Sequence, residues 1–358
     1  MHNVKRQSRS AIEARKAREK SQLDTFLALT DDVLRRKKSQ DYSQEAFDVT
    51  TRIVRINPEF YTVWNYRRNI LIKNVFPSSS PEEIFNLLVS ELMLTMQALQ
   101  AHPKVYWIWN HRRWCLERIP DGPGVPAEHD HEADAQGNDS PAADPAGWRK
   151  RCWSEEMRAV EKMLDKDARN FHAWSYRRYV LANSPTSRPL SSELAYTMRK
   201  IESNFSNFSA WHQRSKIYSK LWEDASSEEV RKAKETEFEL VRNAMYTDPD
   251  DQSVWMYHRW LIGPGHDTEI LNRESSVIQE LLDEQPDSKW CMESLVHYKR
   301  LLLKNRRHEG QESSAVPESS LDALVDECLS LLTQLQTVDS ARRKRYADIA
   351  NDIASDRP

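Results

Sequence analysis

The sequence predicts an all-α protein, a solenoid of about half a dozen stacked helix pairs. Two observations predict this class: the 358 residues include only seven glycines, and a tryptophan-centred motif recurs along the chain. Glycine supplies the tight turns of sheets and phosphate loops, so a chain this poor in glycine favours helices joined by short turns. Repetition at intervals near 40 residues is typical of stacked helix pairs.

Each copy of the motif is a turn, often Asn-Pro or Asp-Pro, followed by a tryptophan and then by one or two arginines. The residue before proline is pushed out of the helical conformation, and proline can begin a helix, so the turn separates two helices. Five copies are clear, and a degraded sixth copy runs from Gln285 to Trp290. The clear copies are centred on Trp64, Trp109, Trp174, Trp211 and Trp255.

The tryptophans lie 45, 65, 37, 44 and 35 residues apart. The long interval contains Asp121–Gly147, 27 residues rich in Gly, Pro, Asp and Ala, and without them the interval is 38 residues. This segment, 121–147, is therefore predicted to be a disordered insertion in an ordinary repeat. It also holds His129, Asp130, His131 and Glu132, which we interpret as part of the disorder rather than as a metal site.

An amphipathic stretch precedes each turn, with an apolar residue ten positions before each tryptophan. We interpret the recurring Trp and Arg residues as scaffold, with Trp wedged between helix pairs and Arg reaching acids of the next repeat or capping helix ends. The alternative is that some copies face a partner, and differences between copies would reveal which. The scaffold set is Trp64, Arg67, Trp109, Arg112, Trp174, Arg177, Trp211, Arg214 and Trp255.

The domain organisation follows from these segments. Residues 1–40 are predicted to form a charged helical arm, 41–305 the repeats, 306–320 a linker and 321–358 a C-terminal helical segment.

Composition excludes several classes of protein. A net charge of −3, from 52 basic and 55 acidic residues, gives no field that would attract nucleic acid. The most apolar stretch, Ile84–Met96, is interrupted by polar residues, so we expect no signal peptide and no integral membrane protein. Four widely spaced cysteines indicate a reduced, cytoplasmic chain. The sequence contains no catalytic triad and no phosphate loop.

The period and the Trp-x-x-Arg-Arg core resemble the α subunits of protein prenyltransferases from about Ala46 to Leu303. Tetratricopeptide arrays have a shorter period and a glycine in each first helix, which these first helices lack. The start Met1-His2, the segment Lys289-Trp290-Cys291 and the tail from Val338 are most similar to the Rab geranylgeranyltransferase (type II) α subunits. The end at Pro358 is similar to their short fungal form.

The resemblance implies a right-handed, crescent-shaped α-α superhelix that wraps around a β subunit. It implies that the β subunit holds zinc and that this chain has no cofactor of its own. The heterodimer would transfer a geranylgeranyl group from geranylgeranyl diphosphate to C-terminal cysteines of a Rab GTPase, which a Rab escort protein presents. Zinc lowers the pKa of the attacking thiol.

One copy of the motif differs in a useful way. Five residues before the tryptophan it has Lys104, where the other copies have Glu59, Arg169, Ser206 and Asp250. By resemblance, Lys104 is the catalytic lysine that reaches the departing diphosphate, where a cation stabilises developing negative charge. The resemblance places five further residues at the substrate edge: Tyr106, Trp107, Asn170, Phe171 and His172.

Departures from the family pattern refine this picture. Phe171 stands where the family has Tyr, so a hydroxyl contact is lost. Trp107 stands where the farnesyl-type subunit has a Gln that grips a CaaX carboxylate, which fits a substrate that is not read through its last residue. His2, on a terminal arm, could reach a metal on a partner.

Two alternatives stay open. The chain could be the α subunit shared by farnesyl and type I geranylgeranyl transferases, or a non-catalytic helical adaptor similar to tetratricopeptide proteins.

Overall fold

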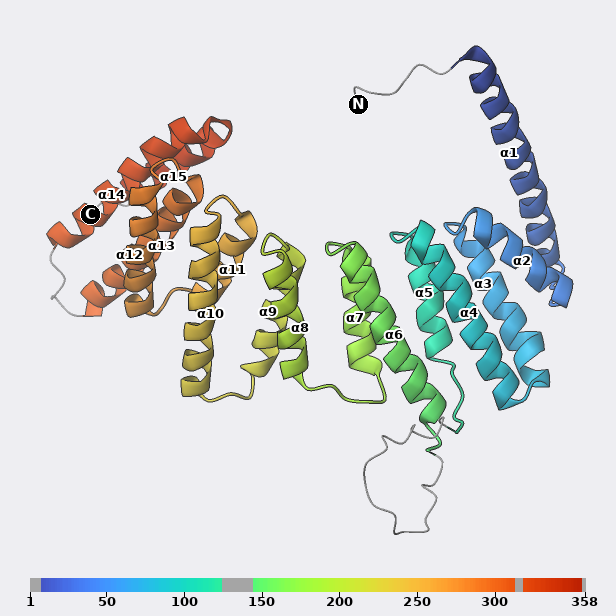
Figure 1. Ribbon diagram of the computed structural model, residues 1–358. Coiled ribbons are helices and arrows are strands. Elements are labelled where there is room, and N and C mark those ends of the chain that lie inside the picture. Colours follow the sequence, from blue (N-terminus) through green and yellow to red (C-terminus); the bar gives the residue numbers. More distant parts are fainter. Residues whose placement is uncertain (1–7, 124–143, 313–317, 356–358) are drawn as a thin grey trace, which may run out of the picture. The chain divides into compact units, whose positions relative to one another are not determined.

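The computed structural model describes residues 8–123, 144–312 and 318–355 (Figure 1). Within these ranges every regular element is a helix, and the one β contact is an isolated bridge between Gly122 and Ala146. The chain divides into two compact units, Met1–Arg188 and Pro189–Pro358. The all-α class predicted from the sequence is confirmed.

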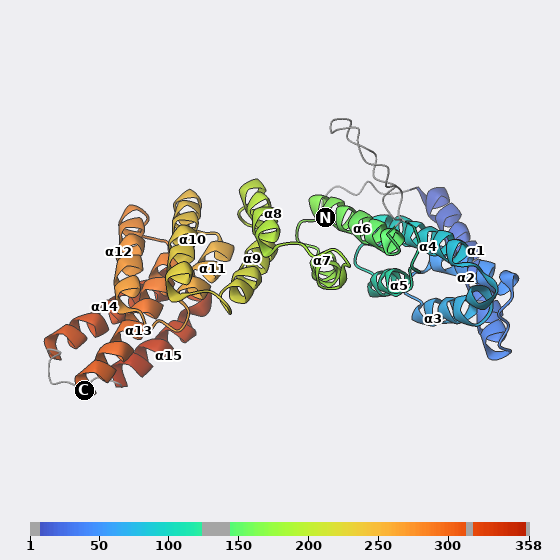
Figure 2. The same cartoon turned by 90° about the horizontal axis from the view of Figure 1, so that it is seen from below.

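The first unit begins with α1 (Arg9–Lys38), which packs against the first helix pair. Three pairs follow, and the two helices of each pair pack together (Figures 1 and 2). The pairs are α2 (Gln44–Ile56) with α3 (Tyr61–Ile70), α4 (Pro81–Ala101) with α5 (Tyr106–Leu116), and α6 (Gly147–Lys166) with α7 (Phe171–Asn183). A π-helical turn, η1 (Leu71–Val75), and a 3-10 turn, η2 (Phe76–Ser78), extend α3.

The second unit contains four helix pairs. They are α8 (Leu190–Ser203) with α9 (Phe208–Leu221), α10 (Ser227–Thr247) with α11 (Gln252–Ile262), α12 (Thr268–Glu284) with α13 (Lys289–Glu312), and α14 (Glu318–Val338) with α15 (Arg343–Ser355). A short 3-10 turn, η3 (Ser340–Arg342), joins the last two helices. The helix-pair solenoid predicted from the repeats is therefore confirmed.

Side-chain caps fix where the helices begin. Ser80 and Ser226 form capping boxes at the starts of α4 and α10, in which the serine and a glutamate three residues later exchange hydrogen bonds. Asn170 and Asn207 cap α7 and α9, the second helices of their pairs. Because the first N–H groups of a helix have no partner within it, these caps also fix the turns between paired helices.

The five motif tryptophans are buried, with no more than 3% of each exposed. Each indole Nε1 donates a hydrogen bond to the backbone carbonyl six residues earlier, at 2.6–3.0 Å. The acceptors are the carbonyls of Pro58, Pro103, Ala168, Phe205 and Pro249. Each tryptophan thus packs in the core and also holds the turn of its own repeat.

Three of the arginines that lie three residues after a motif tryptophan form buried ion pairs with the next helix pair. Arg112 (α5) donates through two nitrogens to Glu156 (α6), with Nη2 to Oε2 at 2.7 Å. Its third nitrogen donates to Thr95 Oγ1 and to the Leu92 carbonyl. Each guanidinium nitrogen thus has an acceptor, and a buried charge that is paired and hydrogen-bonded in this way costs less than an isolated one.

The same link recurs in both units. Arg67 pairs with Glu91, and Arg214 with Glu237, again with two hydrogen bonds each. Sequence reasoning did not single out the glutamates. Their signal was nevertheless present, because each lies 18 residues before the tryptophan of its own repeat. The set is Glu91, Glu156, Glu193, Glu237 and Glu274, counted from Trp109, Trp174, Trp211, Trp255 and position 292.

The sixth repeat has a different register from the one predicted. Helix α12 is capped at Gln285, and the residue seven positions later, where the other repeats have Trp, is Met292. Met292 is fully buried, whereas Trp290 lies two positions earlier with the guanidinium of Arg342 5.6 Å from its ring. The prediction aligned on the nearest tryptophan, but Trp290 is buried too, with 8% exposed, so the spacing from the cap at Gln285 and not burial identifies the register.

The predicted linker, 306–320, is largely helical. Helix α13 continues to Glu312 and α14 begins at Glu318. The segment 304–312 is rich in Lys, Arg, Glu and Gln, which have high helix propensity, so the one glycine within it does not end the helix. Helices therefore occupy both ends of the predicted linker, and residues 313–317 lie outside the described residues.

The two ends of the predicted insertion meet in a neck. Gly122 N donates to the Pro145 carbonyl at 2.6 Å, and Trp148 N donates to the Gly122 carbonyl at 3.3 Å. A Cβ on Gly122 would lie 2.1 Å from Cε3 of Trp148, so only glycine fits here. Of the segment 121–147, predicted to be disordered, residues 124–143 lie outside the described residues, as do His129, Asp130, His131 and Glu132.

Among the described residues, α4 alone is long and apolar enough to cross a membrane by length and composition. Its buried face, however, carries Glu91, which pairs with Arg67, and Thr95, which accepts a hydrogen bond from Arg112. These contacts join α4 to α3 and to α5 through buried arginines, as expected of a helix in the protein core. We therefore interpret α4 as a core helix.

Candidate functional site

The candidate residues lie on two neighbouring turns of the first unit. Lys104 is in the turn between α4 and α5, and Tyr106 and Trp107 begin α5. Asn170 ends the turn between α6 and α7, and Phe171 and His172 begin α7. The side-chain Nδ2 of Asn170 donates a hydrogen bond to the carbonyl of Pro103 at 3.2 Å. The structure thus brings all six residues to one edge of the unit.

Asn170 connects the two turns that form this edge. Only 2% of the residue is exposed, and its Oδ1 accepts hydrogen bonds from the backbone N–H groups of His172 and Ala173 at 3.0 and 3.2 Å. The same amide therefore caps α7 and ties it to the neighbouring turn. Its polar atoms are engaged within the chain, so Asn170 is a positioning residue.

Lys104 presents its amine to solvent. The side chain is 71% exposed, and its one ion pair in the described residues joins Nζ to Oδ2 of Asp167 at 3.8 Å. An exposed pair at this distance contributes about 0–1 kcal/mol, so Asp167 would not prevent the amine from binding an anion. Burial, and then the charge of Lys104, lower the pKa of the His172 imidazole. The charge of Lys104 therefore acts on a residue of the neighbouring turn.

Five aromatic rings form a continuous row beside Lys104, which we call the aromatic row: Tyr61, Trp107, Tyr106, His172 and Phe171. Successive ring centroids are 5.2, 5.5, 6.3 and 3.9 Å apart in that order. Tyr61, Tyr106 and Phe171 are 52%, 54% and 67% exposed. Large exposed aromatic surface of this kind is typical of an interaction site.

Sequence reasoning missed Tyr61, although the motif carried a signal for it. An aromatic residue stands three positions before the tryptophan in four of the five clear copies: Tyr61, Tyr106, Phe171 and Phe208. Each is the first residue of the second helix in its pair, where the side chain is exposed. The recurrence of an exposed aromatic residue at the same helix position indicates that this position contributes to an interaction surface in these repeats.

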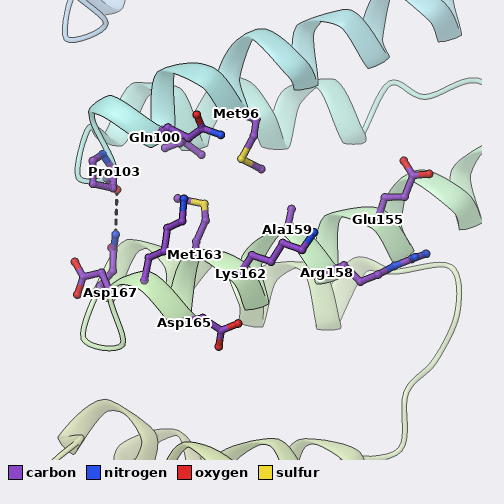
Figure 3. A pocket seen from close by; sticks show the side chains of 13 residues that line it. Met96, Gln100, Pro103, Glu155, Arg158, Ala159, Lys162, Met163, Asp165 and Asp167 are labelled. Atoms are coloured by element: carbon purple, nitrogen blue, oxygen red, sulfur yellow. Dashed lines mark hydrogen bonds between the residues drawn. The ribbon is translucent and has the colours of Figure 1, made fainter.

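A groove of about 870 Å³ runs between α4 and α6 and reaches this edge (Figure 3). Pro103 and Asp167 lie at its one end, and Glu155 and Arg158 lie at the other. Its walls combine apolar side chains with the charged ends of others: Met96, Leu99, Ala159 and Met163 with Arg158, Lys162 and Lys166. The groove gives the candidate edge a binding surface larger than the turns alone.

Among the described residues, no group of three or more His, Cys, Asp or Glu side chains is placed to hold a metal ion. The four cysteines are free and buried, and burial raises the pKa of each thiol, to about 11 for Cys152, Cys291 and Cys328. His2 lies outside the described residues.

Comparison with known proteins identifies the repeats. The family described as protein prenyltransferase alpha subunit repeat matches residues 43–73, 88–119, 153–184, 190–221 and 234–263. These segments correspond to the five pairs from α2/α3 to α10/α11. A solved structure titled Candida albicans protein geranylgeranyltransferase-I complexed with GGPP has a similar fold, with a TM-score of 0.64 and 18% identity over 92% of this chain and 91% of that chain.

Several curated relatives are more specific. The geranylgeranyl transferase type-2 subunit alpha of Schizosaccharomyces pombe is 35% identical over 94% of this chain and 93% of its own length. The subunit of the same name from Saccharomyces cerevisiae is 30% identical, covering 97% and 98% of the two chains. That of Bos taurus is 34% identical over 72% of this chain, which spans 40% of the bovine protein. The chain therefore belongs to the family of geranylgeranyl transferase type-2 alpha subunits.

Proposed function

We propose that this chain works in the cytoplasm as the α subunit of a heterodimer that transfers a geranylgeranyl group from geranylgeranyl diphosphate to C-terminal cysteines of Rab GTPases. A Rab escort protein presents the GTPase, and the β subunit holds the zinc ion and most of the active site. The likeness to two yeast type-2 alpha subunits along nearly the whole of both chains supports this proposal.

Lys104 would contribute to the chemistry electrostatically. In the transfer, a thiolate sulfur forms a bond to C1 of the isoprenoid, the C1–O bond breaks, and its electron pair leaves with the diphosphate. Negative charge therefore grows on the diphosphate oxygens, where a cation stabilises the transition state more than the ground state. The observation that carries this role is the exposed amine of Lys104, held at the edge by a turn that Asn170 fixes.

The aromatic row would pack against the β subunit beside the reacting groups. Its exposed rings supply apolar area, and burying an aromatic side chain at an interface contributes more than most other contacts. Covering this row would also remove water from around Lys104, which strengthens its attraction for an anion. The row and the lysine thus act together in this proposal.

A transfer assay tests the role of Lys104. The chain is co-expressed with a type-2 β subunit, and geranylgeranyl transfer to an escort-bound Rab is measured. We expect Lys104→Ala to lower kcat about 100-fold, as loss of one electrostatic contact to a transition state does, while urea unfolding stays unchanged because the amine is exposed. The matched control is Arg169→Ala, which removes a cation from the same motif position in the next repeat.

Equal losses in both variants, or full activity in Lys104→Ala, would show that no specific role belongs to Lys104. Efficient modification of a CaaX peptide would instead favour the α subunit shared by farnesyl and type I transferases. The mass and zinc content of whatever co-purifies with the chain tests the adaptor alternative. A zinc-containing partner of similar mass supports the transferase, and a weakly bound peptide supports the adaptor.

A further inference from the structure

A small pocket rich in positive charge lies among the C-terminal helices of the second unit. Its volume is about 80 Å³, and it is lined by residues of α11, α13, α14 and α15. Arg259 comes from α11, His297 and Arg300 from α13, and Arg345 from α15, while apolar side chains complete the wall. One water needs roughly 10–15 Å³ by this kind of measure, so the pocket can hold a group of several atoms.

The positive charges of this pocket are not neutralised within the described residues. None of Arg259, Arg300 and Arg345 forms an ion pair there. The one acidic residue in the lining, Glu293, is already engaged, because Arg342 Nη1 lies 3.0 Å from its Oε1 and Tyr346 donates to the same oxygen at 2.6 Å. Three guanidinium groups thus line one small space in which the one carboxylate of the lining is engaged by Arg342 and Tyr346.

Arg259 is the least exposed of the three arginines that line the pocket. Its Nε is inaccessible to solvent and has no hydrogen-bond acceptor among the described residues. A buried donor without an acceptor costs about 1–3 kcal/mol, and most such donors in folded proteins are paired with protein, water or an ion. An acceptor inside the pocket would reduce the repulsion among the guanidinium groups, and a small shift of the Arg259 side chain would be needed for it to reach Nε, which has no accessible surface.

We propose that this pocket binds an oxyanion of the phosphate class, held by Arg259, Arg300 and Arg345. Guanidinium groups match tetrahedral oxyanions because their paired N–H donors bind two oxygens at once. A ligand here would connect α11, α13 and α15, three helices from three successive pairs. The pocket would therefore join the C-terminal pair to the rest of the second unit.

His297 provides a local reporter for the anion. Burial, followed by the charges of Arg259 and Arg300, lowers the pKa of its imidazole to about 4, so the ring is neutral at pH 7. A bound anion would counter these two charges. The ring resonances of His297 should therefore shift when the pocket is filled.

Titration of the full chain with inorganic phosphate tests the proposal. Calorimetry is performed at constant ionic strength, balanced with chloride, and the His297 ring signals are followed by NMR in parallel. We expect saturable binding with a dissociation constant of about 1 mM or lower, and a shift of the His297 signals over the same concentrations. Arg300→Gln and Arg345→Gln each remove an exposed guanidinium and should weaken binding at least about tenfold.

Arg343→Gln is the matched control, because it makes the same change of charge on α15 but does not line the pocket. Its dissociation constant should stay within about twofold of the unaltered chain. A parallel titration with a phosphate monoester distinguishes the source: comparable affinity indicates a terminal phosphate on a larger molecule, and phosphate alone indicates the free ion. No saturable binding, or equal weakening by Arg343→Gln and Arg345→Gln, would overturn the proposal.

Discussion

Two kinds of helix pair can be compared among the described residues. In the pairs that end with α3, α5 and α9, a buried tryptophan holds the turn and a buried arginine joins the next pair through a glutamate. In the last two pairs the tryptophan position holds Met292 and Tyr346, and the arginine position after Met292 holds the buried Leu295. Both kinds have the same helical register but different links.

The charged link is therefore not a condition for stacking a further pair, because α13 packs against α14 although Leu295 holds its arginine position. The hydroxyl of Tyr346 in the last pair lies 2.7 Å from Asp339 Oδ2 in its own turn and 2.6 Å from Glu293 Oε1 in the preceding pair, within hydrogen-bond distance of both. In this last described pair the polar contacts of Tyr346 are made within the pair and with the preceding one. Between the two kinds stands His258, which takes the arginine position after Trp255 and contacts Glu274 at 3.1 Å.

The largest effect should come from breaking one charged link. Arg112→Met leaves Glu156 buried without its partner, and we expect a loss of about 3–5 kcal/mol in the free energy of unfolding. Urea denaturation measures this loss. The control, Arg118→Met, removes an arginine that lies 3.7 Å from Glu117 at the surface, where a loss below about 1 kcal/mol is expected. Equal losses would show that burial of the link does not matter.

Acid should weaken the links that include histidine. Burial is the main cause that lowers the pKa of His111 to about 4, although its contact with Glu91 opposes the shift. The unfolded chain, with a histidine pKa near 6.5, therefore binds more protons than the folded chain between these values, and stability falls as the pH decreases from about 6.5 to about 4. From pH 7 to pH 5 we expect a loss on the order of 2 kcal/mol.

The pKa of His258 is lowered in the same direction, so it adds to the acid sensitivity. The free energy of unfolding, measured by urea denaturation across this pH range, should therefore have a smaller slope in His111→Gln. His102→Gln, in an exposed turn, serves as the control and should keep the slope. An unchanged slope in His111→Gln would contradict the assignment.

The smallest change in the free energy of unfolding should come from substituting the core residue at the tryptophan position, Trp211 in one kind of pair and Met292 in the other. Trp211→Phe removes part of the buried ring and the hydrogen bond that the indole N–H donates to the Phe205 carbonyl. We expect it to lower the free energy of unfolding by about 2 kcal/mol. Met292→Leu changes shape but removes no hydrogen bond, and should cost less than about 1.5 kcal/mol. Thermal or urea unfolding measures both, and a larger loss for Met292→Leu would reverse the comparison.

Much of the fold could be predicted because its signals are local. The glycine count, the turns before each tryptophan and the apolar residue ten positions earlier are properties of single segments. The latter residues, Val54, Leu99, Leu164, Ile201 and Met245, are indeed buried. A repeated segment also reports its own register, so the helix pairs followed directly from the spacing.

The parts that were missed depend on contacts between segments. Glu156 looks like an ordinary helical acid until Arg112, 44 residues earlier, is placed beside it. Asn170 was placed at the substrate edge, but the turn that it bonds to comes from a different repeat. The register of Met292 was missed because a nearby tryptophan attracted the alignment. In each case the decisive neighbour is distant in sequence.

The neck between Gly122 and Trp148 has a practical consequence for protein engineering. Because backbone hydrogen bonds join the chain there, the distance between α5 and α6 is fixed independently of the residues that connect them. The entropic cost of closing a loop rises only slowly with its length. A fluorescent protein or an affinity tag inserted between residues 123 and 144 should therefore leave the spacing of the helix pairs unchanged. This position is a suitable insertion site for labelling the subunit inside its complex.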